Sequence, residues 1–227
     1  MDSKLPFTTF DFWAYLSAGF LLIFVADYVA GTALLSRESW PIVQAVVAVS
    51  VAYVVGHLVA SISAILYERL IVGKVLGYPR DVLFGKAKAS RLIQRAMPEY
   101  FRPLPEKVQL AALRKASKLG EEGPGERLFW AAYSNARDMP AVMAKVDTFL
   151  TQYNFCRNIA LVALLDSAIL FWSRFFRAAP QENLYYAWLA LIVGIGMSFR
   201  YLKYFRLFSV EIYASYAHAK VAGKGQD

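Results

Sequence analysis

Four ionisable residues lie inside or beside long apolar stretches of the chain: Asp27, His57, Arg157 and Asp166. A charge in the middle of a membrane helix costs a few kcal/mol, so such residues usually face a protein interior or a path for water. Counted at about 1.5 Å per residue, His57 and Asp166 fall at similar depths, so a hydrogen bond between them is geometrically possible. Asp27 belongs nearer the outer surface of the membrane. These polar groups either line a path for ions or protons, or are satisfied between helices and fix the packing.

The polar middle of the chain, residues 73–146, carries the other candidate site. It holds fourteen Lys and Arg against seven acidic residues, a surplus that accounts for nearly all of the formal net charge of +8. The candidate ligand-binding residues combine cations at helical spacing with aromatic side chains: Lys88, Arg91, Arg95, Arg102, Trp130 and Tyr133. Such cations, converging from several protomers beside a stacking ring, would hold a nucleotide or an oligonucleotide, because single strands bind basic grooves through base stacking.

The basic surplus of this region also fits a lipid surface or a protein partner. Lys and Arg concentrate on the cytoplasmic side of membrane proteins, where each contributes about 1 kcal/mol toward binding anionic lipid. Alternatively, the basic surface meets the acidic face of a partner protein. Salt-dependent binding of short oligonucleotides or cyclic nucleotides would separate a ligand site from simple attraction to lipid.

Motifs of catalysis and metal binding are missing from the sequence. There is no G-x-S-x-G, H-E-x-x-H, P-loop or dinucleotide-binding fingerprint. The two histidines, His57 and His218, are far apart in the chain, and the single cysteine, Cys156, excludes both an intrachain disulfide and a thiol cluster. We therefore predict a protein that is not an enzyme and uses no metal or cofactor.

The elements that position these residues are four apolar runs, each close to the length of about 20 residues that crosses a hydrocarbon core. Hydrophobic residues make up 58% of the chain, above the roughly half expected of soluble domains. In lipid such runs must be helices, because strands would leave backbone groups unpaired. Short links join the first two runs and the last two, which predicts two hairpins. The predicted spans are residues 12–35, 42–66, 158–176 and 184–199.

Between the hairpins the sequence predicts short helices separated by Pro and Gly, at residues 85–97, 105–119 and 126–139. A further helix starts at Pro140 and runs without a break into the third span. The last helix continues from the fourth span to about His218. Its length of about 50 Å exceeds the roughly 30 Å of a bilayer core.

These elements predict an all-α integral membrane protein, in which four transmembrane helices form two hairpins around a helical cytoplasmic insert. Its three parts are the first hairpin, the basic helical domain, and the second hairpin with a cytoplasmic helical extension: residues 1–72, 73–148 and 149–227. The insert and residues 200–206 are strongly basic, whereas the two links hold few positive charges. Both termini and the insert are therefore predicted to be cytoplasmic.

Small residues predict close contacts between helices. Gly56 and Ala60 form a small-xxx-small pair in the second span, and Ala26 and Ala30 form another in the first. The fourth span contains two glycines, at positions 194 and 196. These patterns fit packing within one bundle or between protomers.

The plan of short membrane hairpins around a compact basic cytoplasmic domain, without an enzyme motif, resembles membrane effector subunits of bacterial anti-phage defence systems of the Kiwa and Hailong type. The resemblance implies a homo-oligomer in the bacterial inner membrane, such as a tetramer, that senses a cytoplasmic cue and opens or disrupts the bilayer. The alternative is a non-conducting membrane anchor or scaffold that recruits a cytoplasmic partner protein. A small transporter is a third interpretation.

Overall fold

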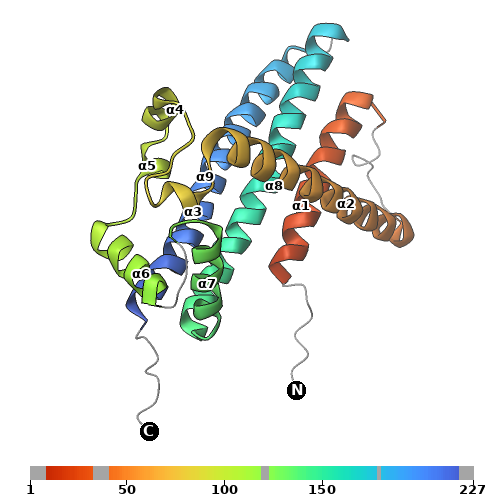
Figure 1. Ribbon diagram of the computed structural model, residues 1–227. Helices are drawn as coiled ribbons and strands as arrows, with labels where there is room; N and C mark the ends of the chain where they lie inside the picture. The colour runs from red at the N-terminus through yellow and green to blue at the C-terminus, as the bar shows by residue number, and fades with distance from the viewer. Residues whose placement is uncertain (1–8, 33–40, 119–122, 178–179, 220–227) are drawn as a thin grey trace. The chain divides into compact units, whose positions relative to one another are not determined.

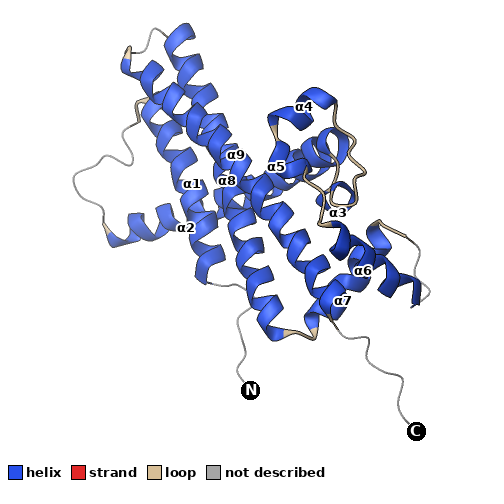
Figure 2. Cartoon of the chain, turned by 90° about the vertical axis from the view of Figure 1, so that its left-hand side faces the viewer, coloured by secondary structure: helices blue, strands red, loops and turns tan. Residues whose placement is uncertain are grey.

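The computed structural model describes residues 9–32, 41–118, 123–177 and 180–219. Helices make up 86% of the structure, and no strand occurs in these residues (Figure 2). The fold class is therefore all-α, as the sequence predicted. The predicted link at residues 36–39 lies outside the described residues, as does part of the link at 178–183.

Four helices are long and apolar enough to cross a membrane (Figure 1). They are α1 (Thr9–Ala30), α2 (Ile42–Ser63) with its continuation, α8 (Pro140–Phe176) and α9 (Glu182–His218). The last two have 37 residues each, or about 55 Å of helix. This length confirms that the helix starting at Pro140 runs unbroken into the third apolar run, and that the last helix extends well beyond the fourth.

The second apolar helix continues as a π-helix, η1 (Ala64–Leu76). Its wider winding is visible at its end, where the Gly77 amide donates to the Val72 carbonyl five residues earlier, across 2.7 Å. The predicted continuation of this helix to about residue 73 is confirmed. Its winding was not predicted, because π-helices are rare and have no simple sequence pattern.

By their internal contacts the residues form two compact units. Unit 1 comprises Met1–Glu68 and Thr151–Tyr201, and unit 2 comprises Arg69–Leu150 and Leu202–Asp227. Each unit therefore combines segments from both halves of the sequence. The end of α9 belongs to unit 2 together with the central short helices, whereas the predicted division at residues 72 and 148 follows chain order and stays a prediction.

In unit 1, α1 and α2 touch backbone to backbone at two glycines. A Cβ atom at Gly19 would lie 1.8 Å from the Ala52 carbonyl oxygen, and one at Gly56 would lie 1.9 Å from the Tyr15 carbonyl oxygen. Only glycine fits both positions, because no L side chain can occupy that space. The small residue at position 56 thus serves packing within one chain.

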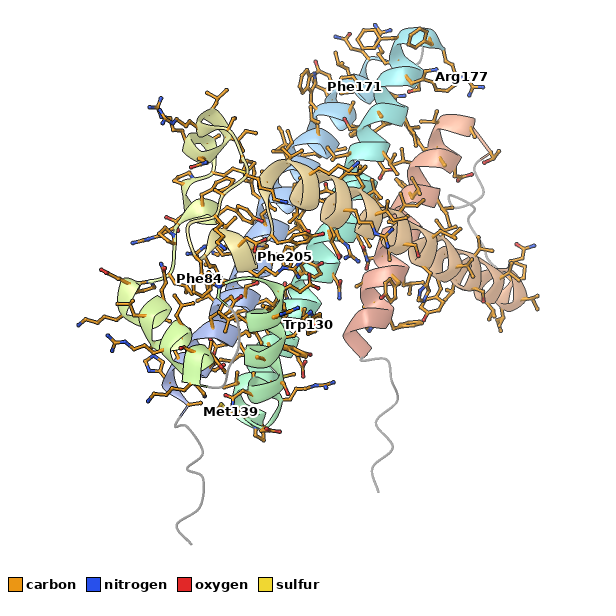
Figure 3. The ribbon with its side chains drawn as sticks, viewed as in Figure 1. Phe84, Trp130, Met139, Phe171, Arg177 and Phe205 are labelled. Atoms are coloured by element: carbon orange, nitrogen blue, oxygen red, sulfur yellow. The ribbon has the colours of Figure 1, made fainter. Side chains whose placement is uncertain are left out.

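Unit 2 holds a second core, built from short helices and the ends of the two longest ones. The short helices are α3 (Pro79–Val82), α4 (Arg91–Ala96), α5 (Pro98–Phe101), α6 (Glu106–Lys118) and α7 (Glu126–Arg137). Apolar side chains from α7, α8 and α9 fill its centre: Leu128, Ala132, Ala136, Val146, Ile212 and Tyr213. Phe84 and Phe205 pack against this core (Figure 3).

The predicted helix at residues 85–97 is wrong in its first half and is confirmed only over Arg91–Ala96. Gly85 has a φ of +79° and ends the turn that follows α3, and residues 86–90 are not helical. This left-handed backbone conformation, which glycine adopts readily, is not helical, so no α-helix can run through residue 85. α4 begins only at Arg91, and Pro98 prevents its continuation. Lys88 therefore precedes the helix and does not share a helical face with Arg91.

The other two predicted short helices, at residues 105–119 and 126–139, match α6 and α7 to within about two residues at each described end.

Lys115 of α6 is buried in unit 2 and closes the C-terminal end of α9. Its Nζ donates to the carbonyl oxygens of Tyr216 and Ala219, each across 3.2 Å, and lies 4.5 Å from the centre of the Tyr216 ring. A cation here complements the partial negative charge of a helix C-terminus and satisfies its free carbonyl groups. Burial nevertheless lowers the pKa of Lys115 from its usual value, because desolvation disfavours the charged form.

Candidate functional site

An apolar groove in unit 1 lies between α1, α8 and α9. Its volume is about 520 Å³. Phe24 of α1, Ile159 of α8 and Val193 of α9 contribute to its walls. Pockets of this size and character accommodate small organic molecules, which they hold by apolar contact and orient through a few polar groups.

Asp166 is the acidic residue of this groove. Its side chain is 5% exposed, and its Oδ1 atom is enclosed without a hydrogen-bond partner among the described residues. Among the described residues, no Lys, Arg or His lines the groove beside it. The hydroxyl of Tyr28, another lining residue, is engaged elsewhere, because it donates to Asn183 Oδ1 across 2.8 Å. A carboxyl group enclosed in this way favours a bound proton or a cationic ligand.

His57 does not line the groove. Its ring stacks on Tyr15 of α1 at 4.2 Å between centres and meets the edge of Tyr53 at 4.6 Å. No hydrogen bond joins His57 to Asp166 in the described part of the chain, so the possible pair between them is not formed. The face of α2 that carries His57 packs on α1 instead.

Asp27 lies at the C-terminal end of α1 and is 9% exposed. Its carboxylate accepts a hydrogen bond from the Thr32 hydroxyl, and its carbonyl accepts one from the Gly31 amide at 3.0 Å. Gly31 has a φ of +68°, as expected of a residue that terminates a helix. These contacts favour a structural role for Asp27 in ending α1.

Arg157 is the centre of a buried polar cluster, which we call the Arg157 cluster and which comprises Ser63, Glu68, Tyr153, Arg157 and Asn158. The guanidinium pairs with the Glu68 carboxylate on η1, and its Nε donates to Ser63 Oγ across 3.1 Å. Ser63 Oγ in turn donates to Asn158 Oδ1 across 2.7 Å. The cluster therefore joins the end of α2 and the start of η1 to α8.

A second polar contact extends this connection to α9. The hydroxyl groups of Tyr67 and Ser198 lie 2.7 Å apart, and the Tyr201 ring packs against both Tyr67 and Tyr153. The sequence places Arg157 and Glu68 at the ends of apolar runs but does not identify them as partners. The one signal in the sequence that could have brought Arg157 and Glu68 together is that both lie at the ends of apolar runs, and hence at similar depths.

The cations of the predicted ligand face are exposed on unit 2. Arg91 and Arg95 lie on α4, with Lys88 before it. Arg102 follows α5 and lies 3.9 Å from the Glu99 carboxylate in an exposed ion pair. Apart from that pair, these cations are solvated, and they could meet an acidic ligand, anionic lipid or an acidic protein.

The aromatic residues predicted to join them lie on α7. Trp130 is 55% exposed and donates its indole N–H to Glu126 across 3.3 Å. Tyr133 is half-buried, and its ring centre lies 6.4 Å from those of Phe129 and Phe208. Figures 1 and 2 show α4 and α7 at opposite ends of unit 2. One chain thus does not place Trp130 and Tyr133 beside Arg91 and Arg95, and their convergence from several protomers stays a prediction.

No protein-family model, curated protein or solved structure matches the chain. The candidate functional sites of the described residues are the Asp166 groove, the Arg157 cluster and the exposed cations of unit 2.

Proposed function

We propose that the chain is an oligomeric, multi-pass inner-membrane protein that senses a cytoplasmic ligand or partner and acts on the membrane as a channel-like effector of anti-phage defence. The observation that carries this proposal is the continuity of α8 and α9. Each runs without a break from an apolar segment in unit 1 into the basic unit 2. Through these continuous helices we expect a change in unit 2 to reach the apolar segments of unit 1.

The surface of the apolar helices supports a location in lipid. α2 exposes a series of large aliphatic side chains, including Ile42 at 84% and Val43 at 73%. The apolar half of α9 does the same with Leu189 and Ile192. Continuous exposed apolar surfaces of this kind are unfavourable in water and mark contacts with lipid or with other protein chains.

The charge of unit 2 supports a cytoplasmic location and an acidic binding partner. Residues 73–146 carry fourteen Lys and Arg against seven acidic residues. Positive residues are retained on the cytoplasmic side during insertion. The same exposed cations attract nucleotides or the acidic face of a protein, and such attraction weakens as salt screens it.

The test is ion flux through liposomes that contain the purified protein, recorded with and without short oligonucleotides or cyclic nucleotides. Lys203 is an exposed residue in the interior of α9. Lys203→Pro breaks the helix, because proline removes a backbone hydrogen bond and clashes with the preceding turn. Lys203→Ala is the matched control, since it removes the same charge and keeps the helix.

We expect ligand-dependent flux from the wild type and from Lys203→Ala, and its loss in Lys203→Pro with ligand binding retained. Flux that persists unchanged in Lys203→Pro would contradict coupling through α9. Tight binding of a cytoplasmic protein without flux under any condition would instead favour the non-conducting anchor or scaffold.

A further inference from the structure

The Asp166 groove combines three features that together select a class of ligand. Its walls are apolar, its acidic group is unpaired, and aromatic rings face the same space. Phe24 and Tyr28 come from α1 and Tyr186 from α9, while Asp166 comes from α8. Aromatic faces attract organic cations, and a buried carboxylate gains most from a partner of opposite charge.

Other classes of ligand fit the groove less well. A bare metal ion needs several oxygen, nitrogen or sulfur ligands, and the described residues contain no group of three or more His, Cys, Asp or Glu that could supply them. An anionic amphiphile would meet the Asp166 carboxylate without a neighbouring cation to compensate it. A neutral acyl chain would fill the volume and leave the carboxyl group without a partner.

We propose that this groove is a binding site for a lipophilic amine. Its ammonium group pairs with the Asp166 carboxylate, and its apolar body lies along Phe24, Ile159 and Val193. This inference goes beyond the proposed function, because the amine can bind whether or not the protein conducts ions.

The test uses three probes with the same chain and different head groups: dodecylamine, dodecanol and dodecanoate. Each is added at the same concentration to the full-length protein in detergent, and bound molecules are counted by native mass spectrometry. We expect saturable binding of dodecylamine, with dodecanol and dodecanoate about 30-fold weaker, because a desolvated charge pair is worth a factor of that order.

Three variants locate the site. Asp166→Asn removes the charge with little change of shape, and Ala190→Trp fills the groove from α9, because Ala190 is one of its lining residues. Asp147→Asn is the matched control, since Asp147 is an exposed carboxylate on the same helix outside the groove. Dodecylamine binding should fall about 30-fold in the first variant, disappear in the second and remain in the control.

The proposal is overturned if dodecanol binds as well as dodecylamine, because the groove would then be a site for neutral acyl chains. It is also overturned if Asp166→Asn binds dodecylamine like the wild type. If the wild type binds no amine and Ala190→Trp converts an oligomer to monomers, the groove is instead a contact between copies of the chain. If Asp166→Asn does not fold, the comparison of the three probes and Ala190→Trp still decide.

Discussion

The Arg157 cluster concentrates charge where the surroundings are otherwise apolar. Arg157 is 7% exposed and divides its guanidinium among a carboxylate, a hydroxyl and a phenol. A buried ion pair adds little net stability compared with a well-packed apolar pair, but removal of one partner leaves the other uncompensated. The planar fork of arginine suits this division, because its five donors point in fixed and different directions.

Arg157→Met is expected to lower the free energy of unfolding by about 3 kcal/mol, because it leaves the Glu68 carboxylate without its cation. Arg157→Lys should recover only part of this loss, since one ammonium group cannot reach Glu68, Ser63 and Tyr153 together. Thermal unfolding of the full-length protein in detergent, followed by circular dichroism, measures both. The double variant Arg157→Met/Glu68→Leu should regain most of the stability. A double variant as unstable as Arg157→Met alone would contradict a role of the unpaired charge in this loss.

Lys115 predicts a pH dependence of stability. Its pKa in the folded protein lies below the ordinary value of 10.5, so between these two pKa values the unfolded chain binds more protons. The free energy of unfolding therefore rises with pH across this window, and below it the contribution is constant. Tyr100 acts in the opposite direction above about pH 10, because burial raises its pKa and only the unfolded chain ionises there.

Lys115→Met separates the two effects, because it retains Tyr100. The difference in stability between the wild type and Lys115→Met should shift in favour of the wild type as pH rises toward 10.5. Thermal unfolding at several pH values from about 7 upward measures this difference. A difference that stays flat across the range would show that Lys115 titrates as it does in the unfolded chain.

The sequence identified Asp166 because a single acid in an apolar run stands out. It did not identify what surrounds Asp166, because the sequence gives only the depth of a residue along its helix. Which side chains meet also depends on the rotation of each helix about its own axis, and the sequence does not give that rotation. His57 matches Asp166 in predicted depth but faces Tyr15. The ion pair between Glu68 and Arg157 was not predicted for a related reason, since Glu68 lies on a π-helix, whose side chains point in directions that differ from those of an α-helix.

At the scale of elements, the crossing of α1 and α2 depends on a contact that no larger residue permits. Gly56→Ala is expected to lower the free energy of unfolding by about 2 kcal/mol, because the new methyl group overlaps the Tyr15 carbonyl oxygen and forces the helices apart. Gly194→Ala should cost less, since its new methyl group would lie 2.8 Å from the Leu164 side chain and 3.1 Å from the Leu164 backbone nitrogen, a smaller overlap than the one at Gly56. Thermal unfolding in detergent measures both changes.

Gly196→Ala is the control for this series. A Cβ atom at Gly196 meets nothing within 4 Å, and alanine is the better helix former, so this variant should be at least as stable as the wild type. Equal stability of Gly56→Ala and Gly196→Ala would contradict the close crossing of the two helices.

The long helices were predictable from sequence, whereas the short helices α3 and α5 were not predicted and α4 was predicted too long. Runs such as α8 combine length, apolar composition and the lack of breaking residues, and these signals agree along the whole element. α4 has six residues, and its boundaries depend on Gly85 and Pro98 more than on the spacing of its charges. Over so few residues, a periodic pattern of cations has little power to distinguish a helix from a turn.

At the scale of the whole molecule, the distribution of charge predicts which side of the membrane each region faces. Cys156 is the single cysteine and is buried, so Cys156→Ala gives a background without reactive thiols. Gln181→Cys places a thiol between α8 and α9, and Lys118→Cys places one at the exposed end of α6. A membrane-impermeant maleimide applied to intact spheroplasts should label Gln181→Cys. It should label Lys118→Cys only after permeabilisation, and labelling of Lys118→Cys from outside would reverse the orientation.

The Arg157 cluster also bears on the order in which the chain assembles. Ser63 and Asn158 are 95 residues apart in sequence, so the ribosome completes α1 and α2 long before Asn158 and Arg157 emerge. The glycine crossing of α1 and α2 needs nothing from the later chain, and this pair can close early. Glu68 then has no cationic partner until Arg157, in the second half of the chain, has been synthesised. A chain that ends before Arg157 therefore carries the Glu68 carboxylate without its cationic partner.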